Sequence, residues 1–152
     1  MNYLNRLKQS GEFEYSIGAN IEEIKHIEEE LGILLPEAYM DFLSECGSCN
    51  YGDVYINGIY KEKDSISYPI VELTKQLRED LHLSEDFIVL HYEVDEFLTL
   101  YKVSNRVRLK DAKVFEAEVF CNDKGDFEIE KPTPMFDSFE EYFEDFLDLA
   151  ED

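Results

Sequence analysis

Two cysteines separated by two residues, Cys46 and Cys49, form the pair whose spacing is best known for chemistry. A C-x-x-C pair closes a reversible disulfide when a helix N-terminus lowers the pKa of the attacking thiol. Here the pair follows a segment predicted to be helical, and the negative end of a helix dipole raises a thiol pKa. The strand that precedes a thioredoxin-like motif is also missing. The spacing therefore favours a turn that ends a helix, with a thiol enzyme or sensor as the alternative.

A metal site has weaker support. Zinc needs a second pair of ligands, and the remaining candidates, Cys121, His26, His82 and His91, have no regular spacing. The segment 122–126 lacks the alternating carboxylates and the terminal glutamate of a calcium loop, and it is more typical of a hairpin turn. We expect no metal and no cofactor.

Motifs for nucleophilic or nucleotide chemistry are also missing from the sequence. The three histidines occur without a serine or cysteine motif such as G-x-S-x-G, and the glycines form neither a phosphate loop nor a dinucleotide fingerprint. We expect His26 to be exposed on a charged helix and His91 to be packed at the end of an apolar strand. Carboxylate pairs are too frequent in this chain to indicate a general acid and base. We predict that the protein is not an enzyme.

The net charge is unusual, because 14 Lys and Arg against 36 Asp and Glu give −22. Direct binding of nucleic acid requires a basic patch, and an anionic membrane would repel such a surface. The nearest basic cluster, which also contains Asp111, is interpreted as a solvated strand and turn: Lys102, Arg106, Arg108, Lys110 and Lys113. We therefore expect no nucleic acid and no membrane as partners. A surplus of carboxylates favours a cationic protein partner, with solubility alone as the alternative.

Length and composition favour one folded domain over residues 1–152. A chain of 152 residues can bury a sizeable core, and 44% hydrophobic residues place it outside the disordered class. No stretch approaches the roughly 18 apolar residues of a membrane helix, and the N-terminal residues lack the apolar region of a secretory signal. Three cysteines do not suggest a disulfide framework. We expect a cytoplasmic protein.

The first part of the chain has the periodicity of helices. A short helix is predicted at Tyr3 to Lys8. A second begins with a capping-box pair, Asn20 and Glu23, and ends at Gly32. Its apolar face is predicted to contain Ile21, Ile24, Ile27 and Leu31. A third helix is predicted to begin with Pro36 at its first position, to bury Tyr39, Phe42 and Leu43, and to stop near Gly47.

The middle of the chain changes to the pattern of strands. Alternation between Tyr51 and Tyr60 predicts two strands joined by a type I′ turn at Asn57-Gly58. A helix is expected from Ile70 to Leu81. Further strands are predicted at Phe87–Leu90, Phe97–Val103, Val114–Phe120 and Phe127–Glu130, the last two antiparallel across a turn at 122–125.

The closing helix is predicted from its cap. Ser138 stands three residues before Glu141, and the core face contains Phe139, Tyr142, Phe143, Phe146 and Leu147. Eight carboxylates and no basic residue lie between Asp137 and Asp152. They form either a solvated face or a partner-binding face. The predicted fold class is α+β, with N-terminal helices, a central and mainly antiparallel sheet, and a closing C-terminal helix.

Particular residues in this order of elements resemble the SUKH superfamily of Smi/Knr-type domains. Its opening signature is similar to Ile21-Glu22-Glu23-Ile24, Glu28-Glu29-Glu30-Leu31-Gly32, Leu35-Pro36-Glu37-Ala38-Tyr39 and Asp41-Phe42-Leu43. The family's last helix is similar to Ser138-Phe139-Glu140-Glu141-Tyr142. The chain departs from the family at residues 46–52, where members commonly have an Asn-Gly-Gly-like loop.

This resemblance implies a non-catalytic α+β domain that serves bacteria as an immunity protein. The implied partner is a cognate, contact-delivered toxin, and we expect a basic nuclease or RNase domain whose surface is occluded. A regulatory scaffold that binds a host signalling or cell-wall protein is the alternative. The candidate contacts are tyrosines and carboxylates of the loops on the sheet side: Tyr51, Asp53, Tyr55, Tyr60, Glu93, Asp95 and Glu96. The other explanation for the tyrosines is half-buried packing within strands.

Overall fold

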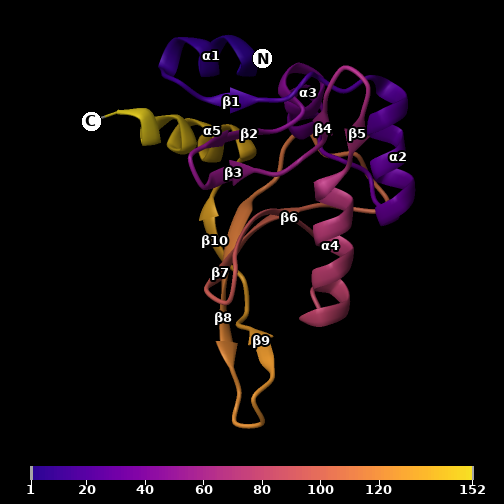
Figure 1. Cartoon of the computed structure of the whole chain (residues 1–152). Coiled ribbons are helices and arrows are strands. Elements are labelled where there is room, and N and C mark those ends of the chain that lie inside the picture. The colour runs from indigo at the N-terminus through magenta and orange to yellow at the C-terminus, as the bar shows by residue number, and fades with distance from the viewer. Residues whose placement is uncertain (1, 152) are drawn as a thin grey trace.

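The computed structural model describes residues 2–151, and in it helices from both ends of the chain lie together at one end of a set of strands (Figure 1). The helices are α1 (Tyr3–Ser10), α2 (Ile21–Leu31), α3 (Glu37–Cys46), α4 (Pro69–Asp80) and α5 (Phe139–Leu147), and a 3-10 turn η1 (Asp148–Ala150) follows the last. The strands are β1 (Glu14–Tyr15), β2 (Cys49–Tyr51), β3 (Val54–Ile56), β4 (Tyr60–Lys61), β5 (Ile66–Ser67), β6 (Phe87–Glu93), β7 (Phe97–Lys102), β8 (Val114–Cys121), β9 (Phe127–Ile129) and β10 (Thr133–Phe136). The predicted α+β class is confirmed.

Every strand pair is antiparallel. The main sheet has the order β10-β8-β7-β6, and β9 also pairs with β8. The strands β1, β2 and β3 form a second small sheet, and β4 pairs with β5. In Figure 1, α1, α3 and α5 gather at one end of the molecule, α4 lies along the main sheet, and the β8–β9 hairpin projects at the opposite end.

Local capping signals place α2 as predicted. Asn20 accepts a hydrogen bond from the amide of Glu23 (2.9 Å), and the carboxylate of Glu23 accepts one from the amide of Asn20 (2.8 Å). Gly32 ends the helix with a φ of 66°, in the left-handed region that glycine adopts without strain. The apolar face is one residue shorter than predicted, because Ile21 is 55% exposed.

Pro36 stands one position earlier than predicted. It is the N-cap of α3, with a ψ of 148°, and Glu37 is the first helical residue. The amides of Glu37 and Ala38 donate to the backbone carbonyls of Leu109 and Lys110, both at 2.9 Å. The loop between β7 and β8 therefore caps α3, a role that the composition of the helix itself does not show.

The core has two apolar clusters on opposite faces of the main sheet. Alternate residues of β6 belong to different clusters, since Ile88 and Leu90 face the helices α1, α3 and α5 while Val89 faces α4. The first cluster is rich in rings, and the centroids of Tyr3 and Phe143 lie 4.8 Å apart at an edge-to-face angle. α4 covers its face through Leu77, which packs with residues of β6, β7 and β8.

The predicted hairpin at Asn57-Gly58 is wrong. Neither residue has the positive φ that a type I′ turn requires, and β3 pairs with β2 rather than with the strand after Asn57. The hairpin turns at Gly52-Asp53 instead, where Gly52 has a φ of 61°. Gly58 is needed for a close approach, because a Cβ there would lie 2.0 Å from the carbonyl oxygen of Gly47. The chain passes directly beneath the end of α3 at this point.

The other predicted strands are present, and the β8–β9 pairing is confirmed with the turn at residues 122–125. β6 continues three residues beyond the predicted Leu90, to Glu93. β10 was not predicted, and it pairs with the half of β8 that β9 leaves free. The sequence did not predict β10 because it contains Pro134, and proline within a run of residues argues against a strand except at the edge of a sheet. None of the helices in residues 2–151 has the length and apolar character needed to cross a membrane.

Candidate partner-binding site

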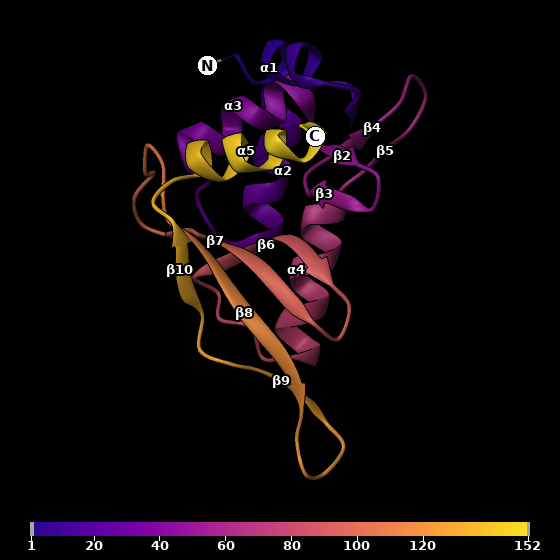
Figure 2. The ribbon, with the colours of Figure 1, turned by 90° about the vertical axis from the view of Figure 1, so that its left-hand side faces the viewer.

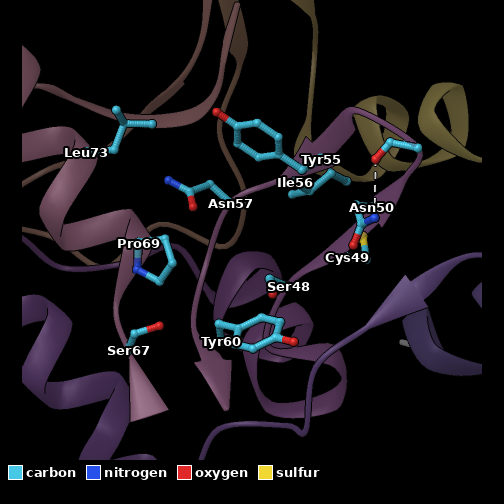
Figure 3. A pocket seen from close by; sticks show the side chains of 11 residues that line it. Ser48, Cys49, Asn50, Tyr55, Ile56, Asn57, Tyr60, Ser67, Pro69 and Leu73 are labelled. Carbon is cyan, nitrogen blue, oxygen red and sulfur yellow. Dashed lines mark hydrogen bonds between the residues drawn. The ribbon is translucent and has the colours of Figure 1, made fainter. Parts of the chain in front are cut away.

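A pocket with a volume of about 470 Å³ lies between the β2–β3 hairpin, the β4–β5 hairpin and the start of α4 (Figure 3). We call it the tyrosine pocket. Its lining consists of Ser48, Cys49, Asn50, Gly52, Tyr55, Ile56, Asn57, Tyr60, Ser67, Pro69 and Leu73. In Figure 3, Tyr55 and Tyr60 stand on opposite sides of the pocket, with Asn57 between them in this view.

Tyr60 is the exposed aromatic residue of the pocket, at 51% exposure. Its hydroxyl donates to the carboxylate of Glu62 (3.1 Å), and this hydrogen bond, together with the charge of Glu62, raises the pKa of Tyr60. The phenol therefore stays neutral and combines an apolar ring with a polar tip. Such side chains are favoured anchors in protein interfaces.

Tyr55 is held more firmly than Tyr60. Its hydroxyl donates to the carbonyl of Tyr92 (3.3 Å) and accepts from the amide of the same residue (3.1 Å). Its ring lies 4.4 Å from the ring of His91, centroid to centroid, and burial raises the pKa of Tyr55. Tyr55 thus connects β3 to β6. Part of its side chain packs within the fold, and another part lines the pocket.

Asn57 forms a rigid part of the pocket wall and is 4% exposed. Its side-chain amide donates to the carbonyl of Val89 (3.1 Å), and its backbone amide donates to the carbonyl of Leu90 (2.8 Å). Its own carbonyl accepts from the hydroxyl of Tyr39 (2.6 Å). Sequence reasoning missed this residue because an Asn-Gly pair is the strongest local signal for a turn.

The seven predicted contact residues do not share one surface. Tyr55 and Tyr60 line the tyrosine pocket, while Tyr51 and Asp53 are chain neighbours of the lining residues Asn50 and Gly52. The ring of Tyr51, at 36% exposure, also packs 5.1 Å from that of Phe13.

The three remaining carboxylates lie near the turn between β6 and β7. Asp95 lines a cavity of about 610 Å³ beside α4 and the β8–β9 hairpin. Glu93 lines a hollow of about 180 Å³ between the sheet and α5. Glu96 is exposed in the turn and lines neither of them.

The two closely spaced thiols are both buried. Cys46 is the last residue of α3 and is followed by Gly47 with a φ of 73°, so the predicted helix-ending turn is confirmed. Burial raises the pKa of Cys46 to about 12 and that of Cys49 well above its ordinary value. Both thiols are therefore protonated near neutral pH, which disfavours thiolate chemistry.

His91 and the segment 122–126 have structural roles. His91 is buried, as predicted, and His26 is exposed with its ring 4.5 Å from that of Tyr68. Asn122 accepts hydrogen bonds from the amides of Lys124 (2.9 Å) and Asp126 (3.0 Å), which accounts for the predicted hairpin turn. Within residues 2–151, no group of three or more His, Cys, Asp or Glu side chains is placed to hold a metal ion.

The basic cluster at residues 102–113 is largely exposed, as predicted, and two of its members form ion pairs. Arg108 forms an ion pair with Glu28 (2.6 Å) and donates to the carbonyl of Leu35 (2.9 Å), so it ties its loop to α2 and α3. Lys102 lies 3.6 Å from Asp86 on the surface. Arg108 is exposed, in agreement with the prediction of a solvated strand and turn, and its guanidinium also satisfies a backbone carbonyl at a helix junction.

Comparison with known proteins agrees with this architecture. The family model SUKH_5, described as SMI1-KNR4 cell-wall, matches residues 2–148. No curated protein matches the chain. The match includes the capped helix α2, the Leu35-Pro36 junction before α3 and the closing helix α5. The chain therefore belongs to the SMI1-KNR4 family of the SUKH superfamily.

Proposed function

We propose that this protein is an immunity protein that binds a cognate toxin and neutralises it without catalysis. Family membership is the observation that carries the proposal, since SUKH domains are known for such roles. We propose further that residues 1–152 act as one domain in the cytoplasm and that the toxin is a basic nuclease. A net charge of −22 supports a cationic partner, because it accelerates association with a basic surface.

The tyrosine pocket is our proposed anchor for the toxin. It offers a half-buried and an exposed tyrosine around a wall fixed by Asn57, so little conformational entropy is lost when a partner side chain enters. Carboxylates at its edge, including Glu62 and Asp53, would face basic groups around that side chain. Aromatic anchors surrounded by charges are the usual arrangement of a strong protein interface.

Co-expression tests this proposal directly. The C-terminal domain of a toxin gene adjacent to this gene is expressed with and without the protein, and cell survival and co-purification are measured. We expect survival and a stable complex. Unchanged killing together with no complex would exclude the proposed function.

A matched pair of variants tests the pocket. Tyr60→Ala removes an exposed ring from the pocket and is expected to raise the dissociation constant of the toxin complex at least tenfold. Phe120→Ala removes a ring of similar exposure, 40%, from the projecting hairpin and is expected to change it less than twofold. Equal effects of the two substitutions would show that the pocket is not the anchor.

A regulatory scaffold is the second candidate, and the cell-wall description of the matching family favours it. In this case affinity purification from the native host would recover a signalling or cell-wall protein, and no toxin gene would lie beside this one. Recovery of a secreted toxin domain would instead favour immunity.

A further inference from the structure

One face of the main sheet is covered over only part of its area. Leu98, Leu100 and Ala117 point toward α4, so the alternate residues of β7 and β8 point to the other side. Figure 2 turns this other side toward the viewer, with α5 above it and α4 behind the sheet. We call its partly covered area the open sheet face, and define it by six residues, of which His91 is buried: His91, Glu93, Phe97, Thr99, Glu116 and Glu118.

The strand register places these six residues in two rows. Glu93 pairs with Phe97, and Phe97 pairs with Glu118 on the next strand. In the neighbouring row Thr99 lies between His91 and Glu116. Directly paired residues project from the same face, with Cβ atoms about 5 Å apart. The ring of Phe97 is therefore flanked by a carboxylate on each side.

The open sheet face adjoins a hollow. Phe97, Thr99 and Glu93 line it from the sheet, and α5 and its extension line it through Tyr142, Asp145, Phe146 and Leu149. Phe97 is half-buried and Leu149 is 41% exposed, so apolar surface is accessible at the floor and at the border. The volume, about 180 Å³, suits one side chain of a partner.

The charges around Phe97 are largely uncompensated. Glu93 lies 3.1 Å from the ring nitrogen Nε2 of His91. Among residues 2–151, no Lys, Arg or His nitrogen lies within ion-pair distance of Glu116, Glu118 or Asp145. Glu93 on β6 and Glu118 on β8 lie on either side of β7, so their negative charges repel each other and the space between them is complementary to a cation.

We propose that the open sheet face docks an arginine side chain of the partner protein, with the guanidinium over Phe97 between Glu93 and Glu118. A planar guanidinium stacks on an aromatic face and donates several hydrogen bonds to carboxylates at the same time. Lysine offers a compact charge without this planar geometry. The inference rests on the proposed function for the identity of the partner, and it adds a second contact surface to the tyrosine pocket.

Peptide titration followed by NMR tests the surface without any toxin. The probe is a blocked Gly-Arg-Gly-Arg-Gly peptide, compared with versions that carry lysine or the neutral isostere citrulline. The arginine peptide is expected to shift the amide resonances of Phe97, Thr99 and Glu118 most strongly. It should bind at least threefold more tightly than the lysine peptide, and the citrulline peptide should leave these resonances unchanged.

Variants separate docking from general attraction to an acidic protein. Glu93→Gln with Glu118→Gln is expected to weaken binding at least fivefold, and Phe97→Leu should weaken it while preserving apolar volume. The matched control, Glu22→Gln with Glu29→Gln, removes the same charge from the exposed face of α2 and should change binding less than twofold. Shifts spread over the whole acidic surface, equal weakening by both double variants, or equal binding of the lysine peptide would overturn the proposal.

The outcome is distinguishable from that of the proposed function. Localised peptide binding together with failure of the co-expression test would exclude the immunity function and support arginine docking at the open sheet face. Toxin neutralisation without localised peptide binding would support the immunity function and exclude arginine docking at the open sheet face.

Discussion

At the scale of single residues, the carboxylate of Asp111 connects three parts of the molecule. It accepts hydrogen bonds from the hydroxyl of Tyr101 on β7 (2.7 Å), from the amide of Ala112 (2.7 Å) and from the amide of Phe139 at the start of α5 (2.8 Å). A negative charge at a helix N-terminus also interacts favourably with the helix dipole. Asp111 therefore supplements Ser138, the N-cap of α5, from a distant loop.

Substitution of this carboxylate should be costly. Asp111→Ala is expected to lower the free energy of unfolding by about 3 kcal/mol, because it leaves part-buried donors without an acceptor. Asp111→Asn keeps an acceptor oxygen and should cost about half as much. Glu29→Ala, at an exposed position of α2, is the control and should change stability by less than about 0.5 kcal/mol. Urea unfolding measures all three, and an Asp111→Ala effect equal to that of the control would contradict the assigned role.

The buried thiol of Cys46 predicts how stability depends on alkaline pH. Its folded pKa, about 12, lies above the ordinary value, so the unfolded state loses its proton first as the pH rises. The stabilisation is complete below about pH 9 and declines toward pH 12, by up to about 1.4 kcal/mol per pH unit for this thiol.

The measurement compares guanidinium unfolding of the wild type and Cys46→Ala between pH 8 and pH 11. The variant should be less stable at pH 8, because it removes a buried group, and its stability should fall less steeply with pH. Buried tyrosines contribute equally to both proteins, so the difference reports on Cys46 and on its charge interaction with Cys49. Identical slopes would show that the thiol titrates at its ordinary pKa.

At the scale of elements, the outer edge of β6 is covered by side chains instead of a strand. Thr74 of α4 accepts from the amide of Val89 (3.1 Å), and Asn57 donates to the carbonyl of the same residue (3.1 Å). Further along the strand, Tyr55 bonds both backbone groups of Tyr92. An edge with satisfied backbone groups resists pairing with another chain. Because Asn57 and Tyr55 also line the tyrosine pocket, this cover keeps the pocket in shape.

Removal of the Thr74 hydroxyl should open this edge. Thr74→Val keeps the shape of a fully buried side chain and leaves the amide of Val89 without an acceptor, at a cost of about 2 kcal/mol. Hydrogen exchange of that amide should accelerate more than exchange at Tyr92. Thr99→Val on the open sheet face is the matched control and should cost less than about 0.5 kcal/mol. Unchanged protection of Val89 would contradict the assignment of Thr74 as the edge cover.

At the scale of the whole molecule, carboxylates dominate the surface, and a net charge of −22 repels itself in the compact state. Several ion pairs offset this locally, among them Arg6 with Glu140 (2.6 Å) and Lys61 with Glu23 (2.9 Å). With 36 acidic residues and 14 basic ones, most carboxylates have no cation available.

Added salt should therefore stabilise the protein. Raising NaCl from about 0.02 M to about 0.5 M shortens the Debye length and should increase Tm by roughly 3 °C, equivalent to about 1 kcal/mol for a chain of this size. Calorimetry with the variant Glu22→Lys and Glu29→Lys provides the control, since its lower charge should reduce the increase. A fall of Tm with salt would show that ion pairs outweigh the repulsion.

Most elements of the fold were predictable because their signals are local. The caps at Asn20 and Ser138 act within three residues, and the apolar patterns of α2, α4, α5 and the long strands of the main sheet follow their periods. The short strands β1 and β5 were missed, because two residues are too few to show a strand pattern. The Asn57-Gly58 turn was wrong because a local preference was overridden by distant contacts.

Only part of the candidate site was predicted from the sequence. Tyrosines of the β2–β3 and β4–β5 segments were named because exposed aromatic residues favour interfaces, and Tyr55 and Tyr60 line the same pocket. Glu93 and Asp95, two residues apart, line different hollows. In a continuous strand, residues two apart would point to the same side; here β6 ends at Glu93, and Asp95 has a φ of 63° in the turn that follows, which composition does not reveal.

By itself, the sequence determined the α+β class, the capped helices, the strong negative charge and the resemblance to its family. These properties depend on residue types and on neighbours within about four positions. The tertiary structure alone decided that Asn57 and Tyr55 form the wall of a pocket, and that Phe97 lies between Glu93 and Glu118. Those arrangements join residues more than 20 positions apart, such as Phe97 and Glu118, and they exist only once strand register and helix packing are established.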